Sequence, residues 1–169
     1  MALPIADTAT AAKTSCRFAR RRCKGHDRAG RVRLGALSEE NVKRVRAAYE
    51  ALGRKDTDAV IELLDPAVEF RNPDYAMEAG TRHGHEGVRK AFETGWEVME
   101  DMRWDIEEVL DHGDVIVVVG RFSGRGRTGR VPVETRFGHV LELRDGKATS
   151  IAWFQDPAEA FAAAGISED

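Results

Sequence analysis

The sequence predicts an α+β domain in which helices pack on one face of a strongly curved antiparallel β-sheet. Residues 38–100 carry apolar residues at helical spacing, interrupted by one short alternating segment. Residues 102–156 instead alternate between apolar and polar residues, which is typical of half-buried antiparallel strands. The resulting order of two helices, a strand, a helix, four strands and a terminal helix favours helices collected on one side of a single sheet.

The segment 131–156 is expected to form a long β-hairpin around which the rest of the chain is organised. Asp145-Gly146 supplies the two central residues of a tight turn in which both need positive φ. The return strand alternates again, with Ile151 and Trp153 on its buried side. The buried side of the first strand is apolar apart from a threonine and a histidine, and it consists of Val131, Val133, Thr135, Phe137, His139, Leu141 and Leu143.

Three helices are expected before the main run of strands. The first begins at Ser38, a capping hydroxyl followed by two acidic residues, and ends at Gly53. The second begins after Asp56 and is stopped by Pro66. The third opens at His85, and its apolar stripe faces the sheet.

The remaining segments are expected to be strands and their connections. A short strand covers residues 68–72, and residues 73–84 read as a polar loop. Further strands are expected at 102–110 and 115–122, and a short terminal helix begins at Pro157.

Two adjacent acids, Glu107 and Glu108, break the alternation of the strand at 102–110. A β-bulge at this point is the first interpretation, since an extra residue places two neighbours on one side. A carboxylate that faces the interior and takes part in catalysis is the second.

The charge of the chain is divided between two regions. The 169 residues carry a formal charge of -3, but residues 1–37 hold nine Lys or Arg against two Asp and contribute +7. This segment has no hydrophobic period, so we expect a disordered basic tail before a domain at 38–169. Nucleic-acid binding is expected only through that tail, if at all.

Metal binding, cofactors and membrane insertion are not expected. Cys16, Cys23 and His26 provide at most three ligands in a segment without regular structure, whereas zinc needs four. No apolar run reaches membrane-spanning length, so a cytoplasmic protein is expected.

Several short segments combine with this order of elements. They are Ala48–Leu52 with Asp56, Phe70–Pro73, Gly84–Arg89, Leu143–Lys147 and Asp156–Ala160. Together they closely resemble the nuclear transport factor 2-like superfamily, and within it the SnoaL-like proteins, over Ser38 to Ile166. The resemblance implies a cystatin-like cone whose open end admits a small apolar molecule. It implies no single activity, since this fold hosts isomerases, cyclases, epoxide hydrolases, transport factors and assembly modules.

The resemblance to ketosteroid isomerases can be followed at three positions. Their catalytic Asp at the end of the first strand corresponds to Asn72. Their first-helix Tyr corresponds to Ala48, one step from Tyr49, and their second oxyanion donor falls on or beside His139. Because an amide cannot accept a carbon-bound proton, isomerisation by that mechanism is not expected.

Two other activities of the fold can be compared in the same way. The water-positioning Asn of limonene-type epoxide hydrolases matches Asn72, and their Arg matches Arg121. Their two Asp residues fall on Ser123 and Trp153, neither of which can act as a base. SnoaL-like polyketide cyclases need an acid or base near the pocket floor, a role that His139 could fill.

The candidate catalytic residues are therefore His139, Asn72 and Arg121. Each also has a structural interpretation: a core histidine bonded to a neighbour, a cap at a strand end, and a solvated edge residue. The expected pocket residues, which could equally form the core, are Phe70, Trp104, Phe137, Ile151, Trp153 and Tyr49.

Two functional hypotheses remain open from the sequence. The first is an isomerase, cyclase or hydrolase that acts on an apolar cyclic or polyketide-like substrate. The second is a ligand-binding or protein-interaction module without turnover. A homodimer is expected in either case, because Val140 and Phe154 would otherwise lie exposed beside each other on the outer face of the sheet, which also carries Glu134, Arg136 and Ala152.

Overall fold

The computed structural model describes residues 34–74, 76 and 79–166 of the chain. Its first described helix, α2 (Leu34–Gly53), begins four residues before the predicted start at Ser38. Residues 34–37, which the sequence assigned to the tail, are therefore helical. The rest of the predicted tail, with Cys16, Cys23 and His26, lies outside the described residues.

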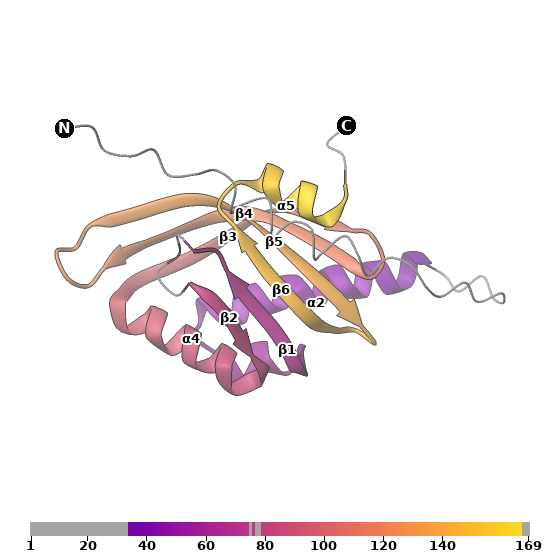
Figure 1. Ribbon diagram of the computed structural model, residues 1–169, viewed down its shortest axis with the longest axis horizontal. Coiled ribbons are helices and arrows are strands. Elements are labelled where there is room, and N and C mark those ends of the chain that lie inside the picture. Colours follow the sequence, from indigo (N-terminus) through magenta and orange to yellow (C-terminus); the bar gives the residue numbers. More distant parts are fainter. Residues whose placement is uncertain (1–33, 75, 77–78, 167–169) are drawn as a thin grey trace, which may run out of the picture.

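One six-stranded curved sheet forms the centre of the structure, which confirms the predicted fold class (Figure 1). The strand order is β2-β1-β6-β5-β4-β3, and all neighbours are antiparallel except β1 and β6, which are parallel. The strands are β1 (Leu64–Asn72), β2 (Gly80–His83), β3 (Met99–Asp111), β4 (Val115–Gly126), β5 (Pro132–Arg144) and β6 (Lys147–Phe154).

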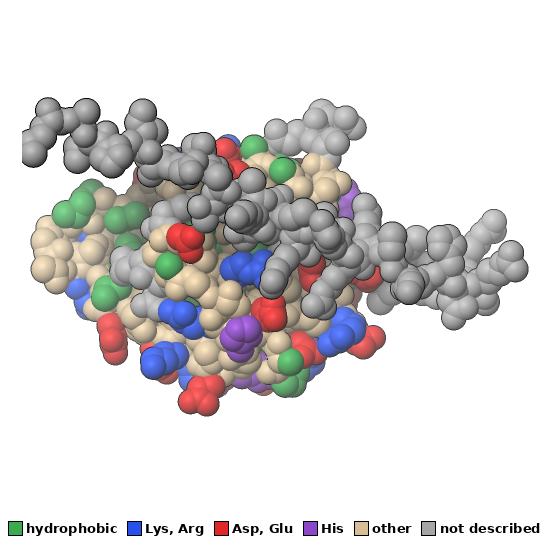
Figure 2. Space-filling model, in the orientation of Figure 1, with side chains coloured by type: hydrophobic (Ala, Val, Ile, Leu, Met, Phe, Trp, Pro, Cys, Tyr) green, Lys and Arg blue, Asp and Glu red, His purple; other side chains and the backbone are tan. Residues whose placement is uncertain are grey.

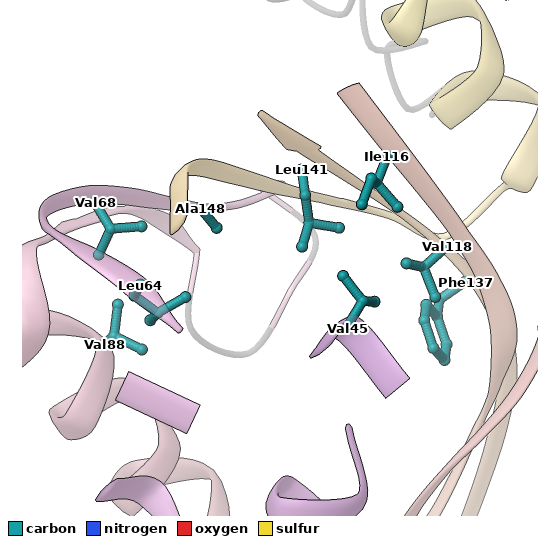
Figure 3. Packing of buried hydrophobic residues seen from close by; sticks show 9 residues of the cluster. All are labelled: Val45, Leu64, Val68, Val88, Ile116, Val118, Phe137, Leu141 and Ala148. Atoms are coloured by element: carbon teal, nitrogen blue, oxygen red, sulfur yellow. The ribbon is translucent and has the colours of Figure 1, made fainter. Parts of the chain in front are cut away.

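The main core lies between the concave face of the sheet and the helices α2, α3 (Thr57–Ile61) and α4 (Gly84–Val98). Figure 3 shows Val45 of α2 opposite Leu141, Val118 and Phe137 of the sheet. Phe137 and Val118 are almost completely inaccessible to solvent. Each fully buried side chain of this size contributes roughly 1.5–3 kcal/mol.

The last helix, α5 (Pro157–Ala164), packs on the opposite face of the sheet (Figure 1). Val117, Val119 and Val140 are buried beneath it together with Ala160 of the helix itself. The expectation that helices cover one face only was therefore incomplete. The expectation that Val140 is exposed on the outer face was wrong, because α5 covers it.

The hairpin turn is confirmed. Arg144 pairs with Lys147, so two residues form the loop, and Asp145 and Gly146 have φ values of 53° and 75°. Both central residues are thus in the left-handed region that this turn type requires.

Strand β1 begins earlier than predicted, and α3 is shorter. The helix ends at Ile61, whereas the sequence suggested that it continues to Pro66. Pro66 instead lies inside β1, where the pairing with β6 is interrupted by a register shift between Leu64 and Glu69. A proline is tolerated at such an irregularity because no ladder hydrogen bond is needed from its nitrogen.

An additional strand and the greater length of β3 and β4 also differ from the prediction. The polar loop contains the short strand β2, which pairs with residues 69–72 of β1. β3 begins at Met99, and β4 continues to Gly126 through the Gly/Arg-rich segment that was read as a connection. Met99 pairs with Gly126, so pairing between the two long strands decides both boundaries.

The predicted β-bulge is confirmed at the adjacent acids. Ile106 pairs with Gly120 and Glu108 with Val119, so Glu107 is the extra residue. The side chain of Glu107 forms an ion pair with Arg136 at 3.0 Å on the outer face. The structure therefore contradicts the alternative of an inward-facing carboxylate at this position.

Within the described residues, no helix is both long enough and apolar enough to cross a bilayer. The 20-residue helix α2 carries charged side chains along its length, including Glu39, Lys43 and Arg46. The cytoplasmic location stays a prediction.

Candidate functional site

The polar residue that interrupts the buried face of β5, His139, contacts Tyr49 of α2. The hydroxyl oxygen of Tyr49 and Nδ1 of His139 form a hydrogen bond. The two rings are stacked, with centroids 5.8 Å apart and an interplanar angle of 18°. Phe137 packs against both, at centroid distances of 6.2 Å from Tyr49 and 4.7 Å from His139. The Tyr49–His139 pair therefore lies in an aromatic cluster between helix and sheet.

The local sequence explains why both residues face the interior. Tyr49 follows Val45 by four residues and precedes Leu52 by three, so all three lie on one side of α2. Val45 and Leu52 are buried. His139 lies between Phe137 and Leu141 at the two-residue period of a strand, so it shares their face of the sheet.

Both members of the Tyr49–His139 pair are held in their neutral forms. Burial lowers the pKa of His139 from its ordinary value to about 3, because an imidazolium ion loses its hydration there. Burial raises the pKa of the Tyr49 hydroxyl above its ordinary value for the corresponding reason, since a phenolate is also disfavoured. At neutral pH the pair is an uncharged phenol and an uncharged imidazole.

A neutral imidazole bonded through Nδ1 can act in two ways. If the Tyr49 hydroxyl donates to Nδ1, then Nε2 of His139 carries the proton and can donate to a ligand. If Nδ1–H donates instead, the Tyr49 hydroxyl is free to donate and Nε2 accepts. In both tautomers the pair has one donor left for an oxygen atom of a ligand. A conjugate acid with a pKa of about 3 makes His139 a weak base at neutral pH.

The strand register brings Asn72 to the level of His139. His139 pairs with Trp153 on β6, and Ile151 of β6 is the partner of Phe70 on the parallel strand β1. Asn72 follows Phe70 by two residues, as Trp153 follows Ile151. Asn72, Trp153 and His139 therefore lie at about the same level on three adjacent strands, roughly 10 Å from first to last.

The six expected pocket residues share one side of the sheet. Phe137 is part of the main core cluster, and the other five pack against it while remaining partly accessible. They are Tyr49, Phe70, Trp104, Ile151 and Trp153. Their roles as ligand contacts stay a prediction.

Arg121 lies away from this group. It pairs with Arg136 in the β4–β5 ladder, and paired residues share a face of the sheet. Arg136 lies three residues before His139, an odd number, so the side chain of Arg121 is on the face opposite to His139. There its guanidinium contacts Glu134 at 2.8 Å and Glu107 at 3.5 Å. These pairs raise the pKa of Arg121, and they leave it on the solvated outer face rather than beside the Tyr49–His139 pair.

An open groove of about 850 Å³ runs between α2 and the end of the sheet formed by β3 and β4. Tyr49 and Trp104 contribute to its walls, whereas His139, Asn72 and Arg121 are not among its lining residues. We refer to it as the α2–β3 groove. Its lining consists of Arg46, Tyr49, Glu50, Gly53, Asp101–Ile106, Ser123–Arg125 and Pro132.

Of the two histidines at the start of α4, His85 has a structural role. Nε2 of His85 is 3.1 Å from the carbonyl oxygen of Leu64, which ties the helix start to β1. His83 occupies the N-cap position of α4 with extended backbone and makes no capping hydrogen bond through its side chain. Among the described residues, no three His, Cys, Asp or Glu side chains are arranged to hold a metal ion.

Tyr49 and His139 were both candidate residues from the sequence, but the hydrogen bond between them was not predicted. The signal was an aromatic residue on the buried stripe of the first helix and a lone histidine on an apolar strand face. The two are 90 positions apart, and only the packing of α2 across β5 brings them together. The sequence pattern did not predict the α2–β3 groove.

A family model of the SnoaL-like domain matches residues 45–151, which is more than half of the chain. The chain belongs to the SnoaL-like family. No curated protein matches the sequence.

Three similar solved structures align with this SnoaL-like protein over at least 90% of their own chains. An NTF2-like protein of unknown function from Burkholderia pseudomallei is 29% identical with a TM-score of 0.64, covering 72% of this chain and 94% of its own. TerC, co-crystallised with polyporic acid, is 25% identical with a TM-score of 0.63 over 70% and 93% of the two chains. A putative SnoaL-like polyketide cyclase from Shewanella denitrificans, at 13% identity and a TM-score of 0.59 over 69% and 90%, shows the fold alone.

Proposed function

We propose that this SnoaL-like protein binds an apolar cyclic or polyketide-like small molecule and polarises one of its oxygen atoms with the Tyr49–His139 pair. The observation that carries the proposal is the hydrogen bond between Tyr49 and Nδ1 of His139 in an otherwise apolar cluster. A mostly apolar lining with a few convergent polar groups is the usual form of a small-molecule site. TerC, which was crystallised with polyporic acid, supports a small molecule as the partner.

The chemistry available to the pair is hydrogen-bond donation to a carbonyl or hydroxyl oxygen. A preorganised donor in a site that excludes water stabilises negative charge as it develops on such an oxygen. Isomerisations and cyclisations that pass through an enolate develop charge in this way. The amide of Asn72 would hold a water molecule or a second oxygen at the same level of the sheet. Arg121 has no part in this proposal, because it lies on the other face.

Binding without turnover is the second candidate, and one observation favours it. The acid at the bulge, Glu107, faces outward, and the strand end where isomerases have a carboxylate has Asn72. Burial lowers the pKa of His139 to about 3, so its imidazole is no stronger a base than the carboxylate that it would replace. Hydrogen bonding to a ligand needs no base, so the pair can serve recognition alone.

A ligand panel with matched variants tests the proposal. Ring ketones, phenols and quinones, with polyporic acid included, are screened by thermal shift and confirmed by calorimetry. Compounds that bind the wild type should lose about ten-fold or more in affinity, about 1.4 kcal/mol, in Tyr49→Phe and His139→Leu. The control is His112→Gln in the exposed turn between β3 and β4.

The results distinguish an enzyme from a binding protein, and they show whether the Tyr49–His139 pair takes part in recognition. Conversion of a bound compound, followed by chromatography, identifies an enzyme, and unchanged recovery identifies a binding protein. Affinity that is equal in the wild type and in both pair variants would exclude the Tyr49–His139 pair from recognition.

We also infer a homodimer, formed through a surface other than the one around Val140 and Phe154 that the sequence suggested. Val98, Val131 and Val133 are 39%, 61% and 40% exposed, and the amide of Arg127 donates to the carbonyl of Val98, so these segments adjoin. Figure 2 shows hydrophobic side chains gathered at this end of the molecule, where Figure 1 has the tip of the β4–β5 hairpin. Exposed apolar groups that adjoin in this way favour contact with a second copy.

A further inference from the structure

We propose that the α2–β3 groove is the ligand-binding site that serves the Tyr49–His139 pair, and that it takes a planar ring compound whose uncharged oxygen reaches Tyr49. The inference rests on the proposed function and deepens it in two respects. It names the place where the ligand lies, and it names the chemical character of the atom that the pair recognises.

Tyr49 belongs to both features. Its side chain lines the α2–β3 groove, and its hydroxyl is bonded to Nδ1 of His139. His139 does not line the groove. A ligand in the groove therefore meets Tyr49 rather than His139. The inference takes the tautomer in which Nδ1–H of His139 donates to the Tyr49 hydroxyl, because that hydroxyl is then free to donate to the ligand and His139 acts as a positioning residue.

The walls of the groove suit a flat ring. Tyr49 of α2 and Trp104 of β3 both provide aromatic surface to it. Met102 and Ile106 share the face of Trp104 on β3, since they lie two residues before and after it. Ring compounds gain offset or edge contacts on aromatic walls beyond the area that they bury.

Gly124 on β4 keeps the floor of the groove open. A Cβ added at this position would lie 2.9 Å from Cε of Met99 and 3.4 Å from Cγ of Met102. A larger side chain must either occupy the groove or push the methionines, one of which lines it. The glycine is therefore a determinant of the size of ligand that fits.

The formal charges along the groove balance. Three arginines and three acids line it, namely Arg46, Arg103, Arg125, Glu50, Asp101 and Asp105. The Tyr49–His139 pair itself is uncharged and lies in an apolar cluster. A carboxylate bonded to the pair would be desolvated among the apolar residues of this cluster, which is costly, whereas a carbonyl or hydroxyl oxygen needs only the donor of the pair.

The test compares two probes of the same ring size on matched variants of the full chain. 2-Naphthol is uncharged at neutral pH and 2-naphthoate is an anion. Calorimetry should give at least about ten-fold tighter binding of 2-naphthol to the wild type, about 1.4 kcal/mol. Gly124→Val should weaken 2-naphthol by a similar factor.

Gly126→Val is the control, because it lies on the same strand and face outside the groove lining, with no neighbour within 3.4 Å of an added Cβ. It should change the affinity by less than about two-fold. Thermal melts verify that each variant is folded. Trp104→Leu replaces Gly124→Val if that variant does not fold, and it should also weaken 2-naphthol.

The outcomes distinguish the groove from the proposed function. If Tyr49→Phe weakens 2-naphthol and the groove variants do not, the groove is excluded and the proposed function stands. Tighter binding of 2-naphthoate overturns the ligand class. If neither naphthalene binds but the binding of another ring compound depends on Tyr49 and His139, only the ligand class is overturned and the proposed function stands. If Tyr49→Phe binds 2-naphthol as the wild type does, or if no compound binds, the inference falls together with the proposed function.

Discussion

Gly138 of β5 lies directly beneath Ala160 of α5. A Cβ added to Gly138 would be 2.5 Å from the Cβ of Ala160 and 3.2 Å from the Cα of Pro157. The helix can approach the outer face of the sheet this closely only because the strand has no side chain at that point. The contact explains why α5 buries Val140, which would otherwise face solvent.

Gly138→Ala should lower the free energy of unfolding by about 1–3 kcal/mol, because the added methyl group overpacks a rigid contact. Urea unfolding measures the change. Gly53→Ala is the control, since no atom lies within 4 Å of an added Cβ at that helix end, and its effect should be neutral or slightly stabilising. Equal destabilisation by both variants would show that the close approach of α5 is not the cause.

His139→Leu should destabilise the protein by about 1–3 kcal/mol, because the hydroxyl of Tyr49 loses its partner in an apolar cluster. Adding Tyr49→Phe should restore part of that loss, since both polar groups are then gone. Thermal and urea unfolding of the two single variants and the double variant give the coupling free energy. Strict additivity of the two single effects would contradict a direct hydrogen bond.

The free energy of unfolding should decrease as the pH is lowered, because His139 is protonated more readily in the unfolded state. Its folded pKa of about 3 lies below the unfolded value near 6.5, so the unfolded state binds a proton first as the pH decreases. The contribution is complete above about pH 6.5 and is lost between about pH 6.5 and 3, at up to about 1.4 kcal/mol per pH unit. Urea unfolding at several pH values measures the slope, which should be smaller in His139→Leu. Parallel curves for the wild type and His139→Leu would exclude this origin.

The protein should scatter light as a dimer at tens of micromolar. Val131→Lys places a charge on the exposed apolar surface at the hairpin end and should shift the mass towards the monomer. Ala158→Lys, on the exposed side of α5, should leave the mass unchanged. A monomer mass for the wild type would contradict the predicted assembly.

Features that depend on neighbouring residues were predicted from the sequence. The alternation along β5 placed Phe137, His139 and Leu141 on one face, and the Asp145-Gly146 turn followed from the need for positive φ. The extra acid at Glu107 produced the expected bulge. Each of these follows from the two-residue period of a strand or from the conformational preference of a residue, so a short window of sequence is sufficient.

Features that depend on how distant elements meet were decided by the tertiary structure. The partner of His139 is a helix residue 90 positions away, and the face of Arg121 follows from its place in the strand ladder. α5 covers the outer face because Gly138 admits it, and β2 forms because β1 offers a free edge. These contacts depend on the order of strands and the docking of helices, which the summed burial of many distant side chains determines and no local pattern contains.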